Sequence, residues 1–267
     1  MQLVTLTSDW GYSDHYIGAV KAKLYSIINN CIIVDISHDI NKFDLMQGAF
    51  IVKHACLNFP KGTIHIIDVD CTESSANKYQ HVVIEYNEQY FICTDNGLPS
   101  IVFEGLNPTK IIGITNTYQD SSYYTFSAFD LFCKVAAIIS YNTNIDELGF
   151  QIPEFIKKNI LNPIIYDDSI LCTVFHVDSY GNVFLNLTID EFLKRIGNNG
   201  FLIEVENNRV DKISKSYDDV RINAPLLTVS SSGNLELAIN KSNASELLGL
   251  KIGTSLIIKI TKKLSRK

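Results

Sequence analysis

The first 140 residues alternate between strand-like and helix-like patterns, and this order limits the fold more than any other feature of the chain. Three short apolar runs have the pattern of buried strands, at residues 3–8, 32–37 and 63–70. Between them, apolar residues recur at helical spacing in the stretches 16–28 and 43–59. Such an order favours a three-layer α/β domain, in which helices cover the faces of a mainly parallel sheet.

Further elements follow in the same part of the chain. The stretches 81–86 and 89–94 flank Asn87-Glu88 and predict a β-hairpin. Residues 110–115 predict one more strand, and residues 126–140 carry small and apolar residues at helical spacing. We therefore expect an N-terminal α/β domain over residues 1–160.

A change of pattern marks a second domain. Between about residue 141 and residue 169 the periodicity is lost, and Asn, Asp, Pro and Lys dominate, as is typical of a linker. Beyond it, seven strand-like runs occupy residues 170–177, 182–187, 201–206, 210–214, 226–230, 234–239 and 255–261. Two short helical stretches, near 190–196 and 245–248, interrupt them. This order predicts a small antiparallel β-barrel or sandwich over residues 168–267.

Composition narrows the classes of partner. With 46% hydrophobic and 19% charged residues, the chain can build a full core. A net charge of −6 argues against nucleic acid or an anionic membrane as partner. The first residues form a strand-like run with no basic n-region, and no apolar run reaches the roughly 18 residues of a membrane span, so we expect a cytoplasmic protein. Six scattered cysteines without a CxxC pair predict reduced thiols and no metal site.

Two acidic residues lie at the ends of predicted strands. Asp9 follows the run 3–8, and Asp70 ends the run 63–70. Ligands of parallel sheets bind beyond the carboxyl ends of the strands, so we expect a small-molecule site there. A carboxylate can accept both hydroxyl protons of a cis-diol, which suits Asp9 to the ribose of a nucleoside. The alternative is structural, with Asp14 capping the next helix and a turn at Gly11.

Other polar segments have two interpretations. The Asn-Gly pair in residues 94–98 is typical of a turn. Residues 177–183 and 230–240 can each form a hairpin turn, and an Asn amide there can also recognise an adenine edge. His38 is either a catalytic base or a structural histidine at a strand exit. The sequence contains no Walker loop, GxGxxG or HExxH motif.

Taken together, these segments resemble one family along nearly the whole chain. It is the S-adenosylmethionine (SAM) hydrolase family, also called SAM hydroxide adenosyltransferases, which is related to the fluorinase and chlorinase. Five segments carry the resemblance in order: Leu6–Gly11 (LTSDWG), Asp35–Ile40 with Phe43-Asp44 (DISHDI and FD), Asp95–Leu98 (DNGL), Asp178–Val183 (DSYGNV), and Ser231 with Leu235–Asn240 (LELAIN).

The resemblance implies an α/β N-terminal domain and a C-terminal β-barrel. It also implies a homotrimer that binds SAM or adenosine between one subunit's N-terminal domain and its neighbour's C-terminal domain, with no cofactor. On the N-terminal side, Asp9 is expected to hold the ribose hydroxyls and Phe43 to provide an aromatic surface. Phe126 and Ala128 are expected to line the ribose and C5′ region.

The C-terminal side is expected to hold the rest of the ligand. By the same resemblance, Asp178 binds the methionine amino group, with Ser231 nearby. Tyr180 and Asn182 face adenine. Asp70 matches the acid of the hydrolase segment, where it can take a proton from a water that attacks C5′. An anionic Asp at that position disfavours a halide nucleophile, and hence halogenase activity.

The chain also departs from the family pattern in the catalytic segments. The family carries an Arg soon after the acid and a His and a second Arg in an FHGRD-like segment. Here the loop 71–78 has no Arg and offers only Lys78, while Ser127 and Phe129 stand at the His and second Arg positions. Three functions therefore stay open: hydrolysis of SAM to adenosine and methionine, binding of SAM or adenosine without turnover, and a trimeric scaffold without ligand.

Overall fold

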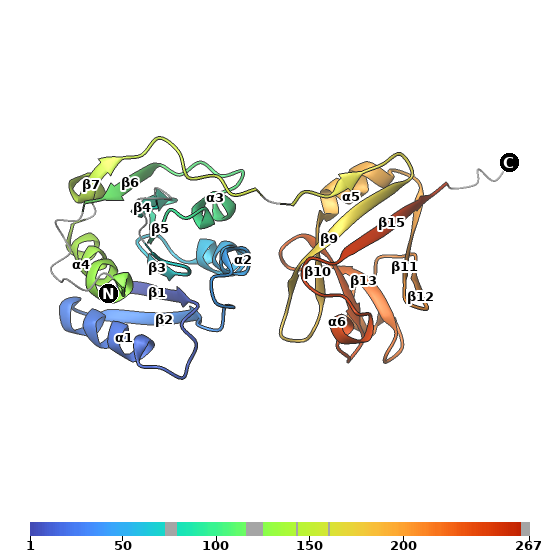
Figure 1. The fold of residues 1–267 in the computed structure, drawn as a ribbon, viewed down its shortest axis with the longest axis horizontal. Helices are drawn as coiled ribbons and strands as arrows, with labels where there is room; N and C mark the ends of the chain where they lie inside the picture. The colour runs from blue at the N-terminus through green and yellow to red at the C-terminus, as the bar shows by residue number, and fades with distance from the viewer. Residues whose placement is uncertain (73–78, 116–124, 143, 160, 263–267) are drawn as a thin grey trace. The chain divides into compact units, whose positions relative to one another are not determined.

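The computed structural model describes residues 1–72, 79–115, 125–142, 144–159 and 161–262 (Figure 1). The chain divides into two units, Met1–Asn159 and Ile160–Lys267. Among the described residues, no helix combines the length and the apolar character needed to cross a membrane. The same residues contain no cluster of His, Cys, Asp or Glu with the geometry of a metal site.

A seven-stranded sheet forms the centre of the first unit, with strand order β2-β1-β3-β5-β4-β6-β7. Its strands are β1 (Gln2–Ser8), β2 (Cys31–Ser37), β3 (Ile64–Asp68), β4 (His81–Tyr86), β5 (Gln89–Thr94), β6 (Lys110–Ile114) and β7 (Gly149–Gln151). Its helices are α1 (Tyr16–Ile27), α2 (Leu45–Ala55), η1 (Cys56–Asn58), α3 (Leu98–Val102), η3 (Ala128–Phe132), α4 (Cys133–Tyr141) and η4 (Ile145–Leu148).

The strand directions confirm a mainly parallel sheet. β2, β1, β3 and β5 pair in parallel. β4 is antiparallel to both β5 and β6, so β6 runs in the same direction as β5, and β7 runs against β6. The carboxyl ends of β1, β2, β3, β5 and β6 therefore lie at one edge of the sheet, where ligands of such sheets bind.

Helices cover the sheet, as the apolar periodicity predicted. One core cluster joins Val20 and Leu24 of α1 and Val135 of α4 to Val4 and Leu6 of β1. Figure 1 shows α1 and α4 together and α2 beside α3, apart from them. The fold class predicted for this part of the chain, a three-layer α/β domain, is confirmed.

The second unit is a curved antiparallel sheet with strand order β12-β11-β15-β9-β10-β14-β13, and β8 pairs with β9. Its elements are β8 (Ile164–Ile165), β9 (Ser169–Val177), β10 (Val183–Thr188), α5 (Ile189–Ile196), β11 (Gly200–Val205), β12 (Asn208–Val210), η5 (Tyr217–Asp219), β13 (Pro225–Val229), β14 (Asn234–Ile239), α6 (Ala244–Leu247) and β15 (Ser255–Thr261). A bridge from Ile213, just after β12, to Leu227 of β13 nearly closes the sheet, which confirms the predicted β-barrel.

Two expected segments differ in extent. The helix predicted over 43–59 begins at Leu45, because Phe43 has a φ of 64° and the carboxylate of Asp44 accepts the backbone N–H of Gln47 at 3.0 Å as an N-cap. The segment 141–169, which we expected to lack regular structure, contains the edge strand β7 and the two-residue strand β8. Three residues are too few for alternation to be recognisable in a sequence.

Candidate functional site

Polar residues gather at the carboxyl edge of the first unit's sheet, because each of four parallel strands is followed by a polar loop. Asp9 follows β1, His38 follows β2, Asp70 follows β3, and Asp95-Asn96 follows β5. Backbone bonds tie the loops to one another: Asp9 N donates to Asp68 O at 3.3 Å, and Gly11 N donates to His38 O at 2.8 Å. The site is therefore built on adjoining strand ends.

Asp9 joins three of these loops. Its buried carboxylate accepts the backbone N–H of Phe43 at 2.8 Å and that of Asp70 at 3.4 Å, both through Oδ2. The Lys42 ammonium donates to the Asp9 backbone carbonyl. Phe43 and Asp70 both have left-handed backbone, with φ of 64° and 50°. Such conformations cost roughly 1–2 kcal/mol per residue, and the carboxylate of Asp9 is what holds both N–H groups in place.

The structural alternative for this loop is only half right. Gly11 does form a turn, with a φ of 76°. Asp14, however, is not the N-cap of α1, because the cap position is His15 and no side chain caps the helix there. Phe43 is 71% exposed.

The segment Asp95–Leu98 holds the Asp70 loop in place through hydrogen bonds. The Asn96 amide donates to Val69 O at 3.1 Å and to Asp70 O at 2.9 Å, and its oxygen accepts Leu98 N–H at 3.1 Å. Asp95 is buried and accepts Ile156 N–H at 3.1 Å through both oxygens.

Asp70 itself is half-buried. Burial and the negative charge of Asp9 raise the pKa of its carboxyl, while Lys158 opposes the rise.

Asp68, which the sequence analysis left inside a strand, is a third acid at this edge. It is the last residue of β3 and its side chain is buried. Burial, and then the charge of Asp9, raise its pKa to about 7, against hydrogen bonds from the Trp10 side chain, the Ala128 backbone and Cys71. No local pattern marks it in the sequence, because the run 63–70 that contains it also carries His65 and ends in a second acid, Asp70.

Aromatic side chains form a wall beside Asp68. Phe126 packs edge-to-face against Trp10 with ring centroids 5.4 Å apart, and against Tyr16 at 5.0 Å. Ser127 and Ala128, which follow Phe126, are buried, and Ala128 begins the π-helical turn η3. Single π-turns are frequent at functional sites, because they re-aim side chains within a helix. Lys78, which was also named for the departures, lies outside the described residues.

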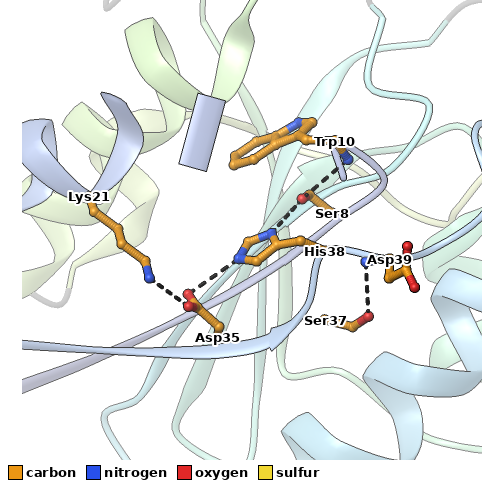
Figure 2. Close-up of polar contacts among 7 residues, drawn as sticks. All are labelled: Ser8, Trp10, Lys21, Asp35, Ser37, His38 and Asp39. Atoms are coloured by element: carbon orange, nitrogen blue, oxygen red, sulfur yellow. Dashed lines mark hydrogen bonds and ion pairs between the residues drawn. The ribbon is translucent and has the colours of Figure 1, made fainter. Parts of the chain in front are cut away.

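Polar contacts link the buried side chains of Ser8 and His38 to the more exposed Asp35 and Lys21 (Figure 2). Ser8 Oγ lies 2.7 Å from Nδ1 of His38, and Nε2 of His38 lies 3.2 Å from Oδ1 of Asp35. Lys21 Nζ lies 2.5 Å from Oδ2 of Asp35. Burial lowers the pKa of His38, although Asp35 opposes this, so the imidazole is neutral at pH 7.

The surroundings of His38 favour the structural interpretation over that of a base. Its ring is fully buried, and both nitrogens face the side chains of Ser8 and Asp35. The ring stacks on Trp10 with centroids 5.7 Å apart and an interplanar angle of 14°. Ser8, His38 and Asp35 thus fix the indole of Trp10 and, with it, the loop that carries Asp9.

In the second unit, a tight turn brings together three of the predicted ligand-binding residues. Oδ1 of Asp178 accepts the backbone N–H of Tyr180 at 2.9 Å and of Asn182 at 2.8 Å, and Oδ2 accepts the Asn182 amide at 3.1 Å. Gly181 has a φ of 80°, which favours glycine. The Tyr180 side chain is 79% exposed. The hairpin-turn interpretation of this segment is correct, and it leaves the Tyr180 ring accessible.

The predicted residues thus form two sets, one on each unit. Asp9, Phe43 and Asp70 are joined by direct hydrogen bonds, and the ring of Trp10, which follows Asp9, packs on Phe126. On the second unit, Asp178, Tyr180 and Asn182 share one turn, whereas the exposed Ser231 lies in the loop between β13 and β14.

Comparisons with known proteins cover both units. Residues 4–149 match the family model described as the SAM hydroxide adenosyltransferase N-terminal domain, and residues 172–257 match the corresponding C-terminal domain. The chain is 31% identical to the (R)-S-adenosyl-L-methionine hydrolase of Methanocaldococcus jannaschii, over 94% of this chain and 93% of that protein. A hydrolase of the same name from Thermus thermophilus is 26% identical over 95% and 98% of the two chains.

A solved structure has the same fold. The crystal structure of an uncharacterized conserved protein from Thermotoga maritima superposes with a TM-score of 0.85 and 27% identity. The similarity covers 96% of this chain and 99% of that one, so it includes both units.

Proposed function

Because its two units match the two domains of the family model, the chain belongs to the SAM hydroxide adenosyltransferase family, and we propose that it hydrolyses S-adenosylmethionine to adenosine and methionine. The observation that carries this proposal is the hydrogen-bonded set of Asp9, Phe43 and Asp70 at the carboxyl edge of the sheet. In this set, Asp9 offers a carboxylate suited to a ribose diol, and Asp70 offers a second acid one loop away.

The proposed reaction needs little covalent chemistry from the protein. A water oxygen attacks C5′ of SAM, the C5′–S bond breaks, and its electron pair neutralises the sulfonium to give methionine. The water loses one proton as the C5′–O bond forms, and adenosine is released. The Asp70 carboxylate takes that proton, and its negative charge stabilises the cationic substrate until the bond breaks.

Asp9 is proposed to bind the ribose. Both of its hydrogen bonds to loop N–H groups use Oδ2. We assign Oδ1 to the 2′ and 3′ hydroxyls, so that one carboxylate organises both the loops and the sugar. Phe43 provides an aromatic surface, and Phe126 and Ala128 line the ribose and C5′ region.

The second unit is proposed to complete the site. Asp178 binds the methionine amino group with Ser231 beside it, and Tyr180 and Asn182 face adenine. We further propose a cytoplasmic homotrimer without cofactor, in which each site combines one subunit's first unit with its neighbour's second unit. Phe43 and Tyr180 are both exposed, so each ring is accessible to a ligand, which supports this proposal.

Product analysis tests the reaction. Purified protein is incubated with SAM, and adenosine and methionine are followed by chromatography. Wild-type protein is expected to form both products in equal amounts, and Asp70→Asn to lose about 10²–10⁴ of the rate, as expected for a positioned general base. Asp146→Asn, an exposed acid paired with Lys110, is the matched control and keeps the wild-type rate. Binding of SAM without products would support the alternative, a binding protein, and overturn the enzyme.

Complementation tests the shared site. Asp9→Ala and Asp178→Ala variants are each expected to be inactive, because each lacks one half of every site. Mixing and re-assembling them at equal amounts should restore about one quarter of the wild-type rate, since each required half is intact in about half of the positions. No recovery from a confirmed mixed trimer would contradict a site between subunits.

A further inference from the structure

Cys71, the residue after the proposed base Asp70, has its side chain anchored to the sheet. Cys71 Sγ lies 2.8 Å from Oγ1 of Thr94, the last residue of β5. Thr94 Oγ1 in turn lies 2.8 Å from Nδ1 of His81, the first residue of β4. Thr94 and His81 are directly opposite each other in the antiparallel pair of β4 and β5, so the sheet holds their side chains together. A row of three polar side chains therefore leads from the sheet to the residue that follows Asp70.

This row lies in the interior, where its hydrogen bonds do not compete with water. Thr94 and His81 are each 1% exposed. Burial raises the pKa of the Cys71 thiol well above its ordinary value and lowers the pKa of His81 to about 4, so both groups are neutral at pH 7. The thiol therefore keeps its hydrogen, which it donates to Ile67 O at 3.7 Å. A hydroxyl can donate to one partner and accept from another, so the Thr94 hydroxyl alone is sufficient to bridge the other two side chains.

The bridge is attached next to a residue with an unfavourable backbone conformation. Asp70 has a φ of 50°, which is costly for a residue other than glycine. Its N–H is held by Asp9 Oδ2 at 3.4 Å, and its carbonyl oxygen accepts the Asn96 amide at 2.9 Å and the Thr72 N–H at 3.1 Å. Cys71 adds a further attachment directly after Asp70, through a side chain instead of the backbone.

We propose that Thr94 is a positioning residue, whose hydroxyl bridges Cys71 and His81. The bridge fixes the Asp70 carboxylate where it takes a proton from the attacking water. The effect on activity rests on the proposed SAM hydrolysis, whereas the bridge itself can be measured without ligand. Thr94 is buried and is assigned no contact with SAM, so its loss is expected to lower kcat and to leave KM nearly unchanged.

Thr94→Val tests the bridge, because it keeps the shape of the side chain and removes the hydroxyl. Thr63→Val is the matched control. Thr63 is also 1% exposed, and its hydroxyl donates to Pro60 O at 2.7 Å just before β3, at the end of that strand away from Asp70. Each variant loses one buried hydroxyl, so we expect similar falls in melting temperature. Thr94→Ser keeps the hydroxyl and is expected to behave as the wild-type protein.

Steady-state kinetics with SAM are the first arm. Thr94→Val is expected to lose about 10–100-fold in kcat with KM changed by less than about twofold, because a small displacement of a catalytic group is costly. Thr63→Val and Thr94→Ser are expected to keep the wild-type kcat. Cys71→Ala removes the other end of the bridge and is expected to lower kcat in the same way, so it replaces Thr94→Val if that variant does not fold. Equal kcat values in the bridge variant and in Thr63→Val overturn the positioning role.

Amide hydrogen exchange without ligand is the second arm. It is measured on the full chain by mass spectrometry of peptides that contain Asp70 and Thr72. Exchange there is expected to be about tenfold faster in Thr94→Val than in Thr63→Val, because the loop opens locally once the bridge is lost. Equal exchange in the two variants overturns the bridge. Faster exchange in Thr94→Val, in a protein whose wild type does not turn over SAM, refutes SAM hydrolysis but keeps the bridge, so the two failures are distinguishable.

Discussion

Replacing Asp68 by Asn is expected to stabilise the first unit at alkaline pH, because the ionised carboxylate of Asp68 is destabilising where it lies. Its pKa rises from 3.8 to about 7 on folding. Between these values the folded unit binds a proton that the unfolded chain does not, so wild-type stability falls as pH rises through this window. Asn does not titrate and removes this dependence.

The magnitude follows from the pKa shift. A shift of about 3 units corresponds to about 4 kcal/mol over the whole window. From pH 5 to pH 8 about two units of the window are crossed. The free energy of unfolding of Asp68→Asn, relative to wild type, should therefore grow by about 3 kcal/mol over that interval.

Urea unfolding followed by Trp10 fluorescence is the assay, since this single tryptophan reports on the first unit. Wild type, Asp68→Asn and the exposed control Asp146→Asn are measured at pH 5 and pH 8. If the difference in unfolding free energy between Asp68→Asn and wild type is the same at both pH values, Asp68 does not bind a proton on folding, and the reasoning is refuted. A gain at pH 8 would mean that this acid is kept at a cost in stability, as residues of functional sites often are.

Three further predictions concern residues that shape the site. Asn96→Ala removes two hydrogen bonds to loop carbonyls and should lower the unfolding free energy of the first unit by about 1–3 kcal/mol. A loss below about 0.5 kcal/mol would contradict the role of Asn96 in holding the Asp70 loop. Gly181 has a φ of 80°, and a Cβ added there would lie 2.0 Å from Asn243 Oδ1. Gly181→Ala should therefore lower the melting temperature of the second unit, and an unchanged melting temperature would contradict this reasoning. Asp9→Asn should lower kcat/KM for SAM roughly 10–100-fold, and a normal value would exclude Asp9 from ribose binding.

Local periodicity was sufficient to predict most of the fold. The hairpin His81–Tyr86 and Gln89–Thr94 has the predicted bounds, because Asn87 and Glu88 adopt φ of 51° and 59° in a two-residue turn. The barrel strands followed from alternation, as the burial of β9 at every second residue illustrates. What periodicity could not give was β7, whose three residues are fixed by pairing with β6 rather than by their own pattern.

The site was predicted in part. Asp9 and Asp70 stand out in the sequence because each lies at the end of a recognisable strand, and the structure joins them at 3.4 Å between Asp9 Oδ2 and Asp70 N. Asp68 does not stand out, because its partners Trp10 and Ala128 lie 58 and 60 residues away in the sequence. Contacts of this kind depend on the tertiary fold, and no local pattern records them.

The central claim is that water attacks C5′ of SAM in this site, and isotope incorporation tests it most directly. The protein is incubated with SAM in H₂¹⁸O, and the products are analysed by mass spectrometry. The account predicts one ¹⁸O in the 5′-hydroxyl of adenosine and none in methionine. Unlabelled adenosine, label in methionine, or the absence of adenosine would contradict it.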